Sequence, residues 1–195
     1  GNTAIGYKAG YATTTATGNT AVGNEAMDAI TTGSTNVAVG SRALSTATTA
    51  TYCVALGGDA LFGIPAGQAV TGAVAIGVEA FKGDSGTTTG ANYTVAIGQA
   101  ALKYLTTGVN VAVGYQSGQT ITTGTQNTLL GYGAGNDITE GGRNTAVGHL
   151  AFGGALDANG DESFDNTFIG FGSGSGDWVT AVSNKNTAVG SHTLV

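Results

Sequence analysis

The sequence predicts an all-β fold, a parallel β-solenoid or β-roll of about eleven coils of about 17 residues each. A glycine-centred unit, Asn-Thr-Ala-Val-Gly-x-x-Ala-Leu, returns along the whole chain. The residues before each glycine alternate with the period of two that is typical of a strand. A unit this short cannot bury its own apolar side, so neighbouring units must stack to form one continuous core.

The central glycines set the period of the repeat. Five of the ten spacings between successive glycines are 17 residues and one is 16, and the four longer ones are 20, 21, 22 and 20 residues. The central glycines are Gly6, Gly23, Gly40, Gly57, Gly77, Gly98, Gly114, Gly131, Gly148, Gly170 and Gly190. At a strand spacing of about 4.8 Å, this repeat predicts a single rod-shaped domain over residues 1–195, roughly 50 Å long.

The three residues before each glycine are expected to form a short strand. The first is Thr or Val and the third is aliphatic, as in Thr20 and Val22. We expect these two columns to share the face of the strand that points inward. The middle residue is Ala in nine units, with Leu129 and Phe168 in the other two, which predicts that the opposite face is tightly packed.

A second pair of columns follows each glycine. Three places after it the residue is always small, as at Ala43, and the next is either large and apolar, as at Leu44, or glycine. This pattern is typical of either a second short strand or a corner. The small column belongs either in the interior of the roll or at a seam between chains. The Thr-Thr-Gly runs that follow, such as residues 31–33, indicate turns.

Two polar columns favour stacking in this register. Asn stands four places before the glycine in eight units, at Asn2, Asn19, Asn36, Asn110, Asn127, Asn144, Asn166 and Asn186. Identical amides one strand apart can hydrogen-bond along the stack. Two places after the glycine the charge alternates along Lys8, Glu25, Arg42 and Asp59, before a second acid, Glu79. Opposite charges on adjacent coils favour this register over a slipped one.

The composition excludes several classes of protein. Hydrophobic residues make up 41% of the chain and charged residues 9%, which indicates a folded protein despite 35 glycines. Asp and Glu number 12 against 6 Lys and Arg, without a basic cluster, so nucleic acid is not an expected partner. Cys53 stands alone, which excludes an intrachain disulfide. No apolar run approaches the ~18 residues that span a bilayer, so membrane insertion is not expected.

The run Asn2-Thr3-Ala4-Ile5-Gly6-Tyr7-Lys8-Ala9-Gly10 and its echoes at residues 36–40 and 110–114 resemble a known family. They are similar to the head repeats of trimeric autotransporter adhesins of the YadA type, and more similar to related repeats in bacteriophage tail fibres. The resemblance implies a left-handed parallel β-roll, three chains side by side in a homotrimer, and an extracellular location on a virion or a bacterial surface. The longer units and Thr-Thr-Gly spacers favour the phage type. The chain would then be a fragment of a longer fibre.

The function implied by this resemblance is attachment to a glycan or protein on a host cell surface, without enzymatic activity. A passive spacer, with its receptor-binding tip elsewhere, is one alternative. A glycan-cleaving tailspike that uses Asp157, Asp161 or Glu162 is another. Ice binding through rows of Thr is a third, although we expect the Thr3 column to face inward.

Candidate binding residues lie where the repeat is interrupted and along one column. The four long connections are residues 62–72, 82–94, 153–165 and 175–185. Tyr93 and Trp178 lie in two of them and would either stack on a ligand or fold back over the rod. Just after the glycine, four consecutive coils carry Tyr115, Tyr132, His149 and Phe171. These rings are expected to form a ladder, which would bind carbohydrate or only stabilise the sheet.

One acidic connection is a candidate calcium site. Side-chain oxygens alternate at Asp157, Asn159 and Asp161, and Asp165 follows. Ca²⁺ binds several oxygens from one tight loop, and the run is similar to the calcium loops of dockerin-like modules. Glu162 replaces a glycine of that motif, and a solvated acidic turn without metal is the alternative. No other cofactor is expected.

Overall fold

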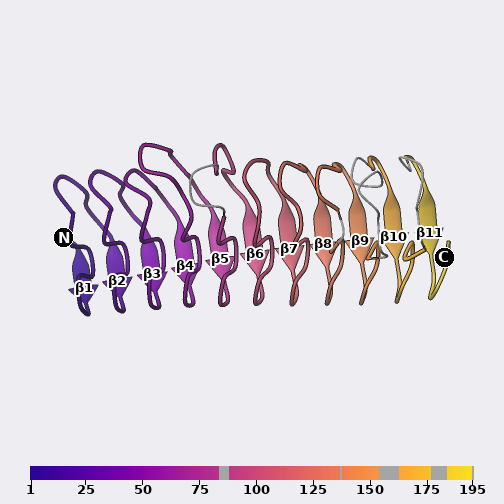
Figure 1. The fold of residues 1–195 in the computed structure, drawn as a ribbon, viewed down its shortest axis with the longest axis horizontal. Coiled ribbons are helices and arrows are strands. Elements are labelled where there is room, and N and C mark those ends of the chain that lie inside the picture. Colours follow the sequence, from indigo (N-terminus) through magenta and orange to yellow (C-terminus); the bar gives the residue numbers. More distant parts are fainter. Residues whose placement is uncertain (84–87, 137, 154–162, 177–183, 195) are drawn as a thin grey trace.

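The computed structural model describes residues 1–83, 88–136, 138–153, 163–176 and 184–194. These residues form eleven parallel strands of one sheet, in which each strand pairs with the next one along the chain. The sheet runs the length of a rod, with the two termini at opposite ends (Figure 1). The strands are β1 (Thr3–Ile5), β2 (Thr20–Val22), β3 (Val37–Val39), β4 (Val54–Leu56), β5 (Val74–Ile76), β6 (Val95–Ile97), β7 (Val111–Val113), β8 (Thr128–Leu130), β9 (Thr145–Val147), β10 (Thr167–Ile169) and β11 (Thr187–Val189). The predicted all-β parallel solenoid is confirmed.

Every strand pairs with the equivalent residues of the next coil. Thr3 lies opposite Thr20 in β1 and β2, and Val54 lies opposite Val74 across one of the long connections. The additional residues of the long connections therefore leave the register of the sheet unchanged. Within the described residues, no helix is long and apolar enough to cross a membrane.

The orientation of the strands is the reverse of the expected one. The middle residue is buried in each of β2 to β11, and the first and third residues are partly or largely exposed. In β3, Ala38 is fully buried, while Val39 is 40% exposed. The Thr and aliphatic columns thus face outward, and the prediction that they face inward was wrong. The interior is narrow, and the buried Ala43 and Leu44 columns already occupy most of it.

The interior packs by pairing large residues with glycines. Leu129 stands in β8 where most strands have Ala, and a Cβ on Gly118 or Gly135 would lie 2.7 Å from its methyl groups. Phe168 in β10 is matched in the same way, because a Cβ on Gly174 would lie 2.6 Å from its ring. A large side chain therefore fits in the middle of a strand where the facing position after the corner is glycine.

Each strand is followed by a corner and not by a second strand. Arg42 and Leu44 have φ values of 55° and 52°, in the left-handed region, and equivalent residues of other coils do the same. Outside the eleven strands the described residues form two isolated bridges and otherwise turns, bends and irregular segments. The backbone still bonds from coil to coil here, since the amide of Leu44 donates to the carbonyl of Ala60. The small column, at Ala43, lies in the interior.

The asparagine ladder is confirmed, and all its members except Asn2 and Asn186 at the two ends are buried. Asn127 donates from Nδ2 to Oδ1 of Asn110 at 3.0 Å and to the carbonyl of Gly141 at 2.9 Å. Its own Oδ1 accepts from both the backbone amide and Nδ2 of Asn144. Of the alternating charges, only Arg42 and Asp59 form an ion pair within the described residues, at 2.7 Å.

Candidate functional site

The outward columns run along the whole rod, and we call them the outer sheet face: the first and third residues of β1 to β11. The third residue is aliphatic in every strand, while the first is Val in five strands and Thr in six. Its most exposed aliphatic residues are Ile5, Val37, Val39, Val111, Leu130, Ile169 and Val189, each more than a third exposed. Large exposed apolar patches on proteins are often interaction sites. Sequence reasoning missed this face, although the pairing of Leu129 with Gly135 and of Phe168 with Gly174 was an available signal.

The predicted ring ladder is present and borders this face. Ring centroids are 5.0 Å apart for Tyr115 and Tyr132, 4.9 Å for Tyr132 and His149, and 5.1 Å for His149 and Phe171. The rings are stacked within 20° of parallel, and His192 closes the row with an edge contact to Phe171. Each ring follows an outward aliphatic residue by two places.

Stacking decides which parts of the rings are accessible. The faces of Tyr132 and His149 are both covered by neighbouring rings, while the side chain of Tyr132 is still about half exposed. The ladder therefore presents ring edges and phenol hydroxyl groups, and not the open faces on which a sugar ring stacks. This geometry suits hydrogen bonding to a ligand or edge packing against a protein.

Tyr93 lies apart from the ladder. It is 66% exposed, has a φ of 57°, and covers Gly72 of the preceding coil, where a Cβ would lie 2.7 Å from its ring. One side of the ring thus folds back on the rod and the remainder is open to a ligand. Trp178, the other aromatic residue predicted to bind, lies outside the described residues.

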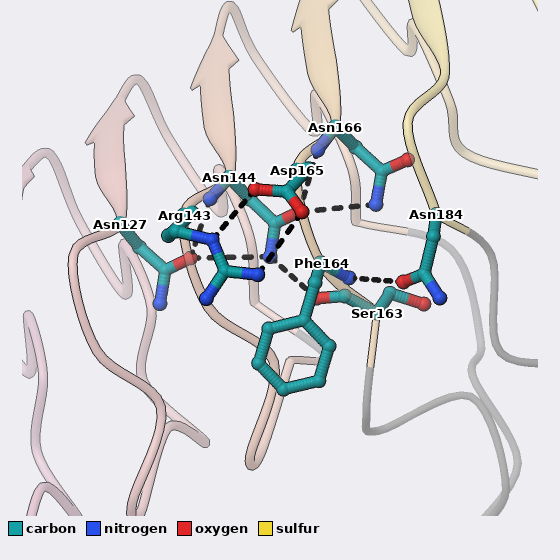
Figure 2. A network of polar contacts seen from close by, with 8 residues as sticks. All are labelled: Asn127, Arg143, Asn144, Ser163, Phe164, Asp165, Asn166 and Asn184. Carbon is teal, nitrogen blue, oxygen red and sulfur yellow. Dashed lines mark hydrogen bonds and ion pairs between the residues drawn. The ribbon is translucent and has the colours of Figure 1, made fainter.

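Asp165, of the predicted calcium set, belongs to a different arrangement (Figure 2). Its carboxylate accepts two hydrogen bonds from Arg143, with Nε to Oδ1 at 2.6 Å and a terminal nitrogen to Oδ2 at 3.0 Å. The guanidinium also lies over the ring of Phe164, 5.2 Å from its centroid. The hydrogen bond from Arg143 lowers the pKa of Asp165. Both carboxylate oxygens are therefore occupied by an arginine.

The other proposed metal ligands cannot be placed beside it. Asp157, Asn159 and Asp161 lie outside the described residues, as does Glu162 of the tailspike alternative. The part of the chain that the structure describes contains no group of three or more His, Cys, Asp or Glu that would hold a metal ion. Of the predicted set, the structure thus describes Asp165 alone, and its partner is Arg143.

Cys53 occupies the asparagine position of its coil and is fully buried. Its thiol lies 3.4 Å from the carbonyls of Thr51 and Val70, and burial raises its pKa. We expect a thiol-specific reagent to label Cys53 only as fast as the coil opens, because the reactive thiolate is both buried and disfavoured. Labelling rates measured across a denaturant series check this, with Ser41→Cys in a Cys53→Ala chain as the exposed control. Native-state labelling of Cys53 at the rate of that control would contradict it.

Comparison with family models, curated proteins and solved structures finds no match for the chain.

Proposed function

We propose that the chain is a segment of a trimeric fibre, on a virion or a bacterial surface, that mediates attachment to a host cell. In this proposal three left-handed rolls lie side by side, with their outer sheet faces in the seam between chains. The observation that carries the proposal is the unbroken run of outward aliphatic residues from β1 to β11. A single chain leaves this run in water, at a cost that association would remove.

The repeat itself favours another copy of the chain as the partner. Contacts at one coil are renewed at the next only if the partner has the same spacing along the rod. A second copy of the chain has the same coil spacing, so its contacts can continue along all eleven strands. A globular partner with a different surface period would match the face at one or two coils only.

The mass of the full chain in solution tests the assembly. We expect light scattering to give the mass of three chains, and Val39→Lys with Leu130→Lys to shift it to that of one chain, because two charges would be buried in the seam. Glu140→Lys, on an exposed loop, is the control and should remain trimeric. A wild-type mass of one chain would overturn the proposal.

Attachment is tested separately from assembly. The trimer should bind host cells or glycan arrays, and Tyr132→Ala should weaken binding by about tenfold if the ladder contacts the receptor. A trimer that binds neither would favour the spacer alternative. Release of new reducing ends from a polysaccharide would instead favour the tailspike alternative.

A further inference from the structure

A cavity of about 680 Å³ lies beside the long connection between β4 and β5. Residues 62–66 of that connection form one wall, and the two preceding coils form the other. Its volume is within the range of about 300–1,000 Å³ that is usual for small-molecule sites. None of the lining residues belongs to the outer sheet face or to the ring ladder, so the cavity is independent of the proposed trimer seam.

The wall formed by the connection is held in place. The hydroxyl of Thr46 donates to the carbonyl of Phe62, and the amide of Gly67 donates to the hydroxyl of Thr48 at 2.9 Å. A turn closes the tip, where the amide of Gln68 donates to the carbonyl of Pro65. Ile64 is fully buried beneath it. The cavity is therefore formed without a ligand.

The charges that line the cavity are unbalanced. Glu25 and Asp28 form no ion pair within the described residues. The lining cation, Arg42, is already engaged, because its guanidinium bonds to Asp59 at 2.7 Å and lies over the ring of Phe62. Burial, and then the nearby charge of Glu25, raise the pKa of Asp28.

Within the described residues, Lys8 forms no ion pair with either carboxylate. The ammonium group of Lys8 lies over the rings of Tyr7 and Tyr11, 5.5 and 5.9 Å from their centroids. It lowers the pKa of Asp28 only as a minor contribution. A cation brought by a ligand would therefore meet two carboxylates that form no ion pair within the described residues.

Ser45 offers a hydroxyl group to a ligand. The residue is 4% exposed and lines the cavity, and its hydroxyl makes no hydrogen bond to another described residue. Asn136 Oδ1 is the only fully buried side-chain polar atom without a partner in the described residues, so the Ser45 hydroxyl is still open to water. A polar group of a ligand in the cavity could replace that water.

We propose that this cavity binds an amino sugar, with the ammonium group at Glu25 and Asp28, a ring hydroxyl at Ser45, and the apolar side of the ring against Pro65. The combination of carboxylates, a hydroxyl and an apolar wall matches the mixed surface of such a ring. A simple alkylamine would reach the carboxylates but leave Ser45 and most of the volume unfilled.

Calorimetric titration of the full chain tests the proposal, with glucosamine, N-acetylglucosamine and n-butylamine as probes at a pH where the amines are protonated. Glucosamine should bind, and the other two should bind at least about tenfold more weakly, because one lacks the charge and the other lacks the ring. Glu25→Gln with Asp28→Asn should weaken glucosamine binding by at least about tenfold, and Ser45→Ala by about threefold. Glu140→Gln is the control for loss of an acidic charge elsewhere.

Thermal unfolding of each variant establishes that it is folded before binding is compared. The proposal is overturned if folded wild-type chain does not bind glucosamine, or if either neutral sugar or alkylamine binds as tightly. Unchanged binding by the folded Glu25→Gln, Asp28→Asn variant would also overturn it. Failure of these tests leaves the trimer proposal unaffected, because that proposal rests on the mass of the assembly.

Discussion

Replacing Gly40 with alanine should destabilise the coils around it by about 3 kcal/mol or more. Gly40 has a φ of +137°, where L residues are rarely found. A Cβ at this position would lie 2.5 Å from the carbonyl oxygen of Gly57 and 2.6 Å from its carbonyl carbon. Both atoms are backbone of the next coil, so the clash can be relieved only by separating the coils.

Gly58 provides a matched control in the equivalent turn of the next coil. Its Cβ would meet nothing closer than the carbonyl oxygen of Ser41, at 3.9 Å, and its φ lies outside the left-handed region. Gly58→Ala should therefore change stability by less than about 0.5 kcal/mol. Because a solenoid can open locally, hydrogen exchange at β3 and β4 is the appropriate measurement, together with thermal unfolding. Equal protection in the two variants would refute the steric explanation.

The glycine column shows what could be predicted from the sequence. Its regular spacing predicted the coil period and the register of every strand, because stacked coils place equivalent backbones in contact. The same periodicity could not determine which face of a three-residue strand points inward, since alternation is symmetrical until the opposite wall is known. The correct orientation depends on the volume of that wall, where Ala43 and Leu44 already fill the interior.

The two large residues of the middle column indicate which face of the strand points inward. Leu129 is accompanied by Gly135 and Phe168 by Gly174, each six residues later in the same coil. Such an exchange of volume is expected only between residues that share an interior. The pairs therefore identify the middle column as the inward one.

The ring ladder could be predicted from the sequence, and the cavity could not. The ring ladder was predictable because Tyr115 and Tyr132 occupy equivalent positions on adjacent coils, which the sheet holds at ring-stacking distance. The cavity was not predictable, because it depends on where the connection after Phe62 folds relative to Asp28 and Ser45, two coils and one coil earlier. Repeat spacing contains no information about the path of an inserted segment.

The second large effect is expected in the asparagine ladder, where Asn127→Asp should destabilise the protein by about 4 kcal/mol. The substitution keeps the shape of the side chain and the oxygen that faces Asn144. It replaces the Nδ2 donor by a second acceptor, which would face Oδ1 of Asn110 and the carbonyl of Gly141. A carboxylate would then be buried against two oxygens with no compensating cation.

Asn24→Asp is the control, since Asn24 is exposed and lies outside the ladder column. Denaturant unfolding should show little change for this variant and a large loss for Asn127→Asp. The loss should extend into β9, because Asn144 donates both its backbone amide and its Nδ2 to Asn127. Loss of hydrogen-exchange protection confined to β8 would show that the amides act coil by coil. Loss in β7 and β9 together would show that the buried ladder couples neighbouring coils into one cooperative unit.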